Sequence, residues 1–248
     1  MPELTDINLY LFLVLALVAE VLGTLGGFGS SLLFVPIASY FFSFQTALGI
    51  TAIFHVLSNL TKIVLFKNGI DKFILIWVGI PAVIFVSIGA WLSQFLTTSW
   101  LEMALGIFLV LTSIAFFMMR NNVIKPTHNY AILGGTVSGF IAGAIGTGGA
   151  IRGLTLTAFQ ISTPVFIATS AFIDLAIDSS RSIVYFFNGY IKSDILYLMP
   201  PLLLVSLLGT YIGKRLLSKF SDKQFKQMVL LLVFFTGLSM LYKAFWAA

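Results

Sequence analysis

The feature that most constrains the fold is a series of long apolar runs separated only by short polar connections. In the 248-residue chain, 59% of the residues are hydrophobic and 9% are charged, whereas a soluble domain carries about 25% charged residues. A bilayer core about 30 Å thick requires about 20 apolar residues in each spanning helix. The sequence therefore predicts an all-α polytopic membrane protein. The connections are too short to hold a soluble catalytic domain, so we expect the function to lie within the bilayer.

The apolar runs form two sets that repeat along the chain. The first set is expected near 7–23, 30–43, 45–66, 73–96 and 102–119, and the second near 131–145, 150–160, 162–187, 194–217 and 227–246. A shift of 120 residues places Gly23, Gly26 and Gly29 on Gly143, Gly146 and Gly149, and Asn68-Gly69 on Asn188-Gly189. We interpret residues 1–120 and 121–248 as two transmembrane repeats of one integrated domain, each with about four principal helices. Internal repeats of this kind are typical of secondary transporters.

The basic loops indicate how the repeats are oriented. If each Gly-rich stretch turns the chain back as a helical hairpin, nine basic loop residues lie on one side of the membrane and two on the other; if it only kinks one span, the division is six against five. The positive-inside rule favours the hairpin and makes the basic side cytoplasmic. Each half then crosses an odd number of times, so we predict inverted repeats with both termini outside. The nine residues are Lys67, Lys72, Arg120, Lys125, Lys214, Arg215, Lys219, Lys223 and Lys226, and the two are Lys192 and Lys243.

The two glycine-rich breaks, 23–30 and 143–149, are the candidate binding site. Non-helical backbone inside a bilayer is tolerated only where protein buries it or where it lines a watered cavity. The helix that restarts after each break presents free N–H groups and a positive dipole end, which favour an anion. The alternative is that the glycines serve only close helix packing. The candidate substrate-binding residues are Gly26, Gly27, Gly29, Ser30, Gly146, Thr147, Gly148, Gly149 and Arg152.

Ionisable residues within the spans are a second group of candidates, because inserting each one costs about 2.5–3.5 kcal/mol. Arg152 follows the second break by three residues, where its guanidinium can bind an anion. The alternative for Arg152 is a structural salt bridge with Glu20 or Asp178. Asp178 and Arg181 share a helix face, so they form either a structural pair or a pair in which Asp178 takes up a proton and releases Arg181 for substrate. The coupling or gating candidates are Glu20, His55, Lys62, Asp174, Asp178 and Arg181.

Two of these candidates have simpler alternatives. Lys62 is close enough to the polar connection at 67–72 to snorkel to the cytoplasmic surface. His55 has the unperturbed pKa that suits proton transfer, but a membrane histidine also serves as a plain hydrogen-bond partner between helices.

The Gly-x-Gly-Gly-type breaks Gly26-Gly27-Phe28-Gly29 and Gly146-Thr147-Gly148-Gly149, one near the start of each half, resemble those of the TauE/SafE family of sulfite and organosulfonate exporters. The resemblance covers essentially the whole chain and implies a small anionic substrate such as sulfite or a short sulfonate. We therefore expect a proton-coupled, alternating-access exporter in the bacterial inner membrane. An anion channel is the first alternative, and an intramembrane enzyme or assembly factor is the second.

The residue inventory narrows the chemistry further. The chain has no cysteine and two histidines that are far apart in sequence, so we expect no metal site, no cofactor and no enzyme activity. The net charge of +5 belongs mostly to the loops, so nucleic acid is not an expected partner. The expected partners are a small anion and the lipid bilayer, and a second copy of the chain in a homodimer is a further candidate partner.

Overall fold

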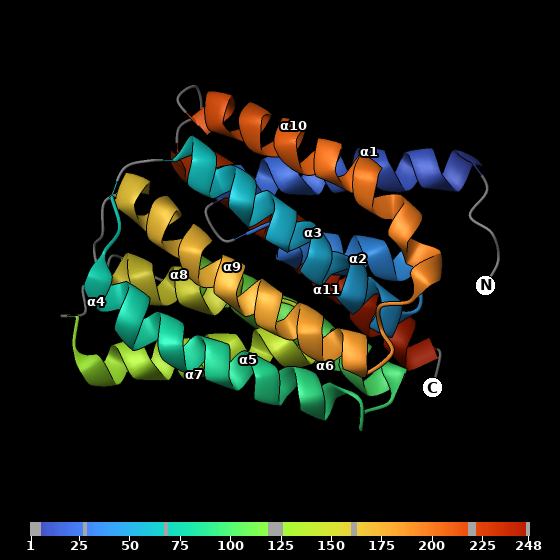
Figure 1. Cartoon of the computed structure of the whole chain (residues 1–248), viewed down its shortest axis with the longest axis horizontal. Helices are drawn as coiled ribbons and strands as arrows, with labels where there is room; N and C mark the ends of the chain where they lie inside the picture. The colour runs from blue at the N-terminus through green and yellow to red at the C-terminus, as the bar shows by residue number, and fades with distance from the viewer. Residues whose placement is uncertain are drawn as a thin grey trace.

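The computed structural model describes residues 6–26, 29–66, 69–118, 126–159, 163–217 and 222–246, and the elements in these ranges are helices (Figure 1). Six described helical stretches are long and apolar enough to cross a membrane. They are residues 6–25, 44–65, 72–93, 98–118, 193–216 and 229–246. The chain is therefore an all-α, multi-pass membrane protein, as its composition predicts.

The helices follow one another in the same order in both halves. In the first half they are α1 (Asp6–Gly26), α2 (Ser31–Phe41), α3 (Phe44–Leu65), α4 (Lys72–Ile74), η1 (Leu75–Gly79), α5 (Ile80–Ser93) and α6 (Thr98–Met118). In the second half they are α7 (His128–Ile145), α8 (Gly149–Ala158), α9 (Thr163–Phe187), η2 (Ser193–Leu198), α10 (Met199–Leu217) and α11 (Asp222–Trp246). Gly69 and Gly189 occupy equivalent turns and have φ values of 88° and 73°, which L side chains rarely adopt.

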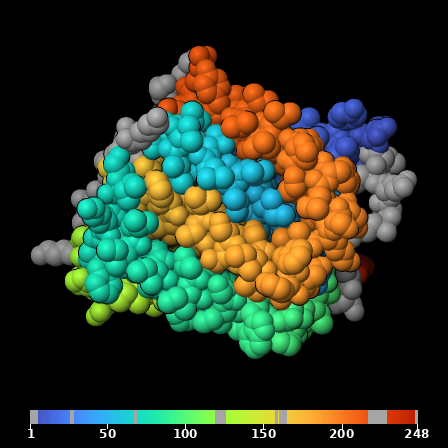
Figure 2. All heavy atoms as spheres, in the orientation of Figure 1, coloured from blue at the N-terminus to red at the C-terminus, as the bar shows by residue number. Residues whose placement is uncertain are grey.

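Helices α3 and α9 lie side by side in the middle of the molecule and run in opposite directions (Figure 1). The contacts between their side chains define this direction. His55 contacts Arg181, whereas Asn59, one turn later in α3, contacts Asp178, which precedes Arg181 in α9. Figure 2 shows the side chains of α3 and α9 as adjacent bands between α10 and α5. The two central helices thus bring one polar face from each half together.

The other contacts between the halves depend on small residues. Helix α5 packs against α7, and α1 packs against α10. At the first of these contacts, a Cβ atom added to Gly139 would lie only 2.2 Å from the carbonyl oxygen of Ala82. Such close approach of helix backbones is typical of membrane proteins, where small residues replace the hydrophobic effect as the basis of packing. Small residues thus allow helices of the two halves to pack closely.

The distribution of side chains is reversed relative to that of a soluble protein. Large apolar residues such as Leu111, Phe117 and Phe235 are exposed on the outer faces of α6 and α11, whereas Glu20 and Arg181 are buried. In a bilayer the exposed apolar faces meet lipid, and charged groups lie in the protein interior. The buried charges are therefore the place to look for a functional site.

Each half begins with a pair of helices joined at a glycine-rich break. Helix α2 has 11 residues and α8 has 10, which correspond to about 15–17 Å and are too short to cross a bilayer. Gly29 has φ 83° in the first break, and Gly146, directly after α7, has φ 81° in the second. Gly27 and Phe28 lie outside the described residues.

Candidate functional site

A small cavity lies where the two breaks meet α3 and α9. The first break contributes Gly29 and Ser30 to its wall, together with Ser31 at the start of α2, and the second break contributes Gly146, Gly148 and Gly149. The space open to the centre of a water molecule is about 20 Å³, and about 10–15 Å³ is enough for one water. The breaks, which are about 120 residues apart in sequence, therefore share one interior space.

Most of the candidate binding residues named from the sequence are in this wall. Arg152 joins the residues of the two breaks there. Thr147 is fully buried, and its Oγ1 lies 3.0 Å from Ser31 Oγ, so these two hydroxyls link the breaks directly. Gly26 is the last residue of α1, and Gly27 lies outside the described residues.

Glycine is required in the second break because the backbone passes too close to α7 for a side chain. A Cβ atom on Gly148 would lie 1.9 Å from the carbonyl oxygen of Ser138. Arg152 donates its backbone N–H to the carbonyl of Gly148 at 3.3 Å. The N–H groups of residues 149–151 precede this bond and so have no intrahelical acceptor. The start of α8 thus presents backbone donors and a positive dipole end to the cavity wall.

Three ion pairs surround the cavity, and all of their side chains are buried except that of Asp174, which is partly exposed. Arg152 Nη2 lies 2.5 Å from Asp174 Oδ1, Arg181 Nη2 lies 2.7 Å from Asp178 Oδ1, and Lys62 Nζ lies 3.1 Å from Glu20 Oε1. The pairing of Asp178 with Arg181 is the one that their spacing suggests. Arg152 does form a salt bridge, but the predicted partner, Glu20 or Asp178, was wrong. The partner is Asp174. The charges of the six side chains balance.

Arg152 and Arg181 each have one N–H group without a hydrogen-bond partner among the described residues. Nε of Arg152 and Nε of Arg181 are buried, and neither has an acceptor among the described residues. An unsatisfied buried donor of this kind costs about 1–3 kcal/mol. Both side chains line the cavity. A ligand with several acceptor oxygens would satisfy both donors, and an oxyanion has this chemistry.

Arg181 connects the two central helices to the second break. Its Nη1 donates to the carbonyls of Gly146, at 2.6 Å, and Ala142, at 3.1 Å. Its Nη2 lies 3.2 Å from Nδ1 of His55. Asn59 Nδ2 donates to the second oxygen of Asp178 at 2.7 Å. A displacement of the Arg181 side chain would therefore break its contacts with His55, with Asp178 and with the carbonyl groups at the second break.

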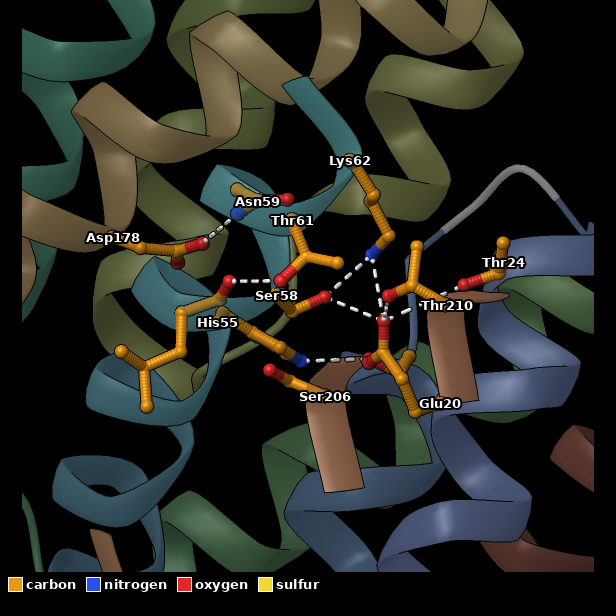
Figure 3. Close-up of polar contacts among 12 residues, drawn as sticks. Glu20, Thr24, His55, Ser58, Asn59, Thr61, Lys62, Asp178, Ser206 and Thr210 are labelled. Atoms are coloured by element: carbon orange, nitrogen blue, oxygen red, sulfur yellow. Dashed lines mark hydrogen bonds and ion pairs between the residues drawn. The ribbon is translucent and has the colours of Figure 1, made fainter. Parts of the chain in front are cut away.

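The carboxylate of Glu20 is not part of the cavity wall and lies among polar side chains of α1, α3 and α10 (Figure 3). Its Oε2 accepts from Ser30 Oγ at 2.5 Å, and its Oε1 accepts from Ser58 Oγ at 2.5 Å and from Thr210 Oγ1 at 3.0 Å. Lys62 donates to Ser58 Oγ at 2.8 Å in addition to its ion pair with Glu20. Lys62 thus points into the protein, and its prediction as a snorkelling residue was wrong.

Sequence reasoning missed Ser58, Asn59 and Thr210. Ser58 and Asn59 lie on the face of α3 that also carries His55 and Lys62, so the spacing of three to four residues between these polar side chains was the available signal. Thr210 has no such signal, because the contact with Glu20 depends on how α10 packs against α1.

A family model described as Sulfite exporter TauE/SafE matches residues 11–240 of the chain. The match covers most of the sequence, so the chain belongs to the TauE/SafE family, whose members are membrane transporters of sulfite and related anions. No curated protein and no solved structure matches the chain. The resemblance drawn from the glycine breaks is therefore confirmed.

Proposed function

We propose that this member of the TauE/SafE family is a proton-coupled secondary transporter that carries small oxyanions, such as sulfite or short organosulfonates, together with protons across the bacterial inner membrane. The observation that carries the proposal is the cavity, where both glycine breaks meet two buried arginines whose Nε–H groups have no partner among the described residues. The anion would lie there, between the halves, after the side chains of the wall move apart, because the cavity as it stands has room for about one water.

The site offers an anion three kinds of donor. The first residues of α8 offer their free backbone N–H groups. Arg152 and Arg181 offer planar guanidinium groups, whose paired N–H donors match the oxygens of an oxyanion. Gly29, Gly146 and Gly149 have no side chain between the backbone and the ligand, and Ser30 and Gly148 line the same cavity. Donors that are fixed in a water-poor interior bind charge more strongly than the same donors in water.

The ion pairs supply the reason for proton coupling. An anion that binds Arg152 or Arg181 has to displace Asp174 or Asp178, which already hold these cations. The displaced carboxylate would be a buried, unpaired charge, which is costly unless the group is neutralised. Protonation of the aspartate removes this cost, so anion binding and proton binding favour each other. Asp178, Asp174 and Arg181 are therefore the coupling groups that we propose nearest the substrate.

The arrangement of the helices supports alternating access by inverted halves. The central helices α3 and α9, which occupy equivalent places in the two halves, run in opposite directions, and the start of α1 and the end of α11 lie at the same end of the molecule (Figure 1). Lys214 donates to the carbonyl of Leu65, at the end of α3 that we propose to be cytoplasmic. Lys243 pairs with Glu102 near the start of α6. We propose that both termini lie outside and that the halves rock around the site.

Binding is tested by thermal unfolding of the detergent-purified protein with sulfite, sulfate, methanesulfonate and acetate. A ligand at 100 times its Kd should stabilise the folded state by about 2.7 kcal/mol. The informative variant is Arg152→Gln combined with Asp174→Asn, which removes the cation without leaving a lone buried carboxylate. We expect this double variant to melt cooperatively and to lose the stabilisation by sulfite.

The matched control is Arg215→Ala, because Arg215 is an exposed arginine that lies over the ring of Tyr211 on α10. It should keep the response to sulfite. The proposal is wrong if none of the oxyanions stabilises the wild-type protein, or if the double variant binds sulfite with unchanged affinity.

A further inference from the structure

Glu20 differs from the aspartates in its access to the cavity. His55, Ser30 and Lys62 line the cavity, whereas Glu20 is fully buried and is not part of the cavity wall. Its oxygens are occupied by the hydroxyls of Ser30, Ser58, Thr24 and Thr210 and by Lys62 Nζ. A proton that moves between the cavity and Glu20 therefore has to pass through one of these neighbouring side chains.

A chain of three hydrogen bonds connects Arg181 to Glu20 through His55 and Ser30, and the donor of each bond can be assigned. A guanidinium group only donates, so Nδ1 of His55 is the acceptor of its 3.2 Å contact with Arg181. In a neutral imidazole the proton is then on Nε2, which donates to Ser30 Oγ at 2.9 Å. Ser30 Oγ in turn donates to Glu20 Oε2 at 2.5 Å. The three contacts form a relay. In this relay the ring nitrogen of His55 that carries no proton, Nδ1, is occupied by its hydrogen bond from Arg181.

We propose that Glu20 is a second proton-binding carboxylate of this transporter, that it is loaded through His55 and Ser30, and that its protonation makes Lys62 available to the anion. The inference rests on the proposed function, because the event that opens the relay is the binding of an anion to Arg181.

The relay balances in protons. The anion pairs with Arg181 and draws its guanidinium away from Nδ1 of His55. An excess proton that reaches the cavity from bulk solution binds Nδ1, Nε2 passes its own proton to Ser30 Oγ, and Ser30 passes its original proton to Glu20 Oε2. Afterwards His55 is a neutral imidazole with its proton on Nδ1, Ser30 is again a hydroxyl, and Glu20 is a neutral acid. One proton has moved from the cavity to Glu20.

The charged neighbours of this relay determine its effect. Lys62 is the cation that pairs with Glu20, and Arg181, held by Asp178, is the cation that faces His55. Neutral Glu20 leaves Lys62, which lines the cavity, without a carboxylate partner. The site then gains one positive charge at the moment when the anion enters. Because Arg181 blocks Nδ1 until an anion draws it away, this proton follows the anion rather than preceding it.

The relay is present in only one of the two halves. A shift of 120 residues places Glu20 on Phe140, Ser30 on Ala150, His55 on Leu175 and Lys62 on Ser182. The helices of the second half follow one another in the same order, but Ser182 is the one polar residue at these four positions, and none of them is ionisable. The four residues are thus not required by the duplicated fold, and a role in transport explains why their cost in the membrane is tolerated.

The experiment measures protons taken up per sulfite bound, with a pH-indicator dye in weakly buffered detergent solution. Sulfite's own protonation is the same for every variant and cancels in the comparison. We expect His55→Gln and Ser30→Ala each to take up about one proton fewer than wild type and to bind sulfite up to about tenfold more weakly. We expect Glu20→Gln to lose the same proton but to bind sulfite at least as tightly as wild type, because Lys62 is then always available.

The matched control is Ser39→Ala, since Ser39 is a buried serine on α2, the helix that begins directly after Ser30, and its hydroxyl donates to the carbonyl of Pro36. It should keep wild-type proton uptake. Wild-type uptake in Ser30→Ala, which removes a single hydroxyl and decides the question even if His55→Gln does not fold, would overturn the relay. Weaker sulfite binding by Glu20→Gln would overturn the role of Lys62. Failure of the wild-type protein to bind sulfite would instead overturn the proposed function, and the inference with it.

Discussion

The substitution Asp178→Asn tests whether a carboxylate and the transported anion compete for Arg181. Asp178 Oδ1 lies 2.7 Å from Arg181 Nη2, and its Oδ2 accepts from Asn59 at 2.7 Å. Asparagine keeps the size and one neutral acceptor oxygen but removes the charge. The free energy of sulfite binding should become more favourable, because the anion no longer displaces a charged partner.

The magnitude follows from the difference between the two hydrogen bonds. A bond to a charged group contributes about 1.5–3 kcal/mol and a neutral one about 0.5–1.5 kcal/mol. The substitution therefore lowers the cost of freeing Arg181 by about 1–1.5 kcal/mol, which corresponds to about 5- to 12-fold tighter binding at a pH where Asp178 is ionised in the wild-type protein. At low pH the wild-type aspartate is protonated and the difference should disappear.

The assay is sulfite-dependent thermal unfolding across a pH series, with the affinity of the variant divided by that of the wild-type protein at each pH so that the titration of sulfite cancels. Asp194→Asn is the matched control, because Asp194 is an exposed acid at the start of η2. It should give a ratio near one throughout. A ratio for Asp178→Asn that is below one, or that does not change with pH, would refute the competition between aspartate and anion.

Two further predictions concern the stability of the site. Gly148→Ala should lower the free energy of unfolding by more than Gly69→Ala, because the new Cβ at position 148 would lie 1.9 Å from the carbonyl oxygen of Ser138. Gly69 has open space around it, so alanine there costs only about 1–2 kcal/mol for its left-handed backbone. Equal losses in thermal unfolding would contradict this. Lys62→Met should cost about 3–5 kcal/mol by leaving Glu20 buried and unpaired, and adding Glu20→Gln should restore most of the stability; no recovery in the double variant would show that the pair is not coupled.

The general nature of the protein could be predicted from the sequence because it depends on local patterns. Apolar runs of about 20 residues specify spanning helices whatever they pack against, and the glycine breaks at 26–29 and 146–149 exclude continuous helices. Arg152 could be placed near the second break because three residues separate it from Gly149. The conclusion that it faces the cavity needed only helical geometry.

The partners of the buried charges could not be predicted in the same way. Arg152 pairs with Asp174, and not with the two acids that sequence reasoning proposed, because the rotation of α9 against α8 selects which acid faces it. The contact between Glu20 and Thr210 joins residues 190 positions apart. Such contacts depend on the way in which helices of the two halves pack together, and no periodicity within a single helix records that packing.

The most direct test of proton-coupled anion transport is the uptake of radiolabelled sulfite by proteoliposomes under an imposed pH gradient, with protein-free liposomes as the background. The account predicts that the wild-type protein accumulates sulfite above its equilibrium distribution, in the direction set by the pH gradient, and that a protonophore abolishes the accumulation. Sulfite flux that the protein accelerates equally with and without the gradient would indicate a channel and would contradict the account.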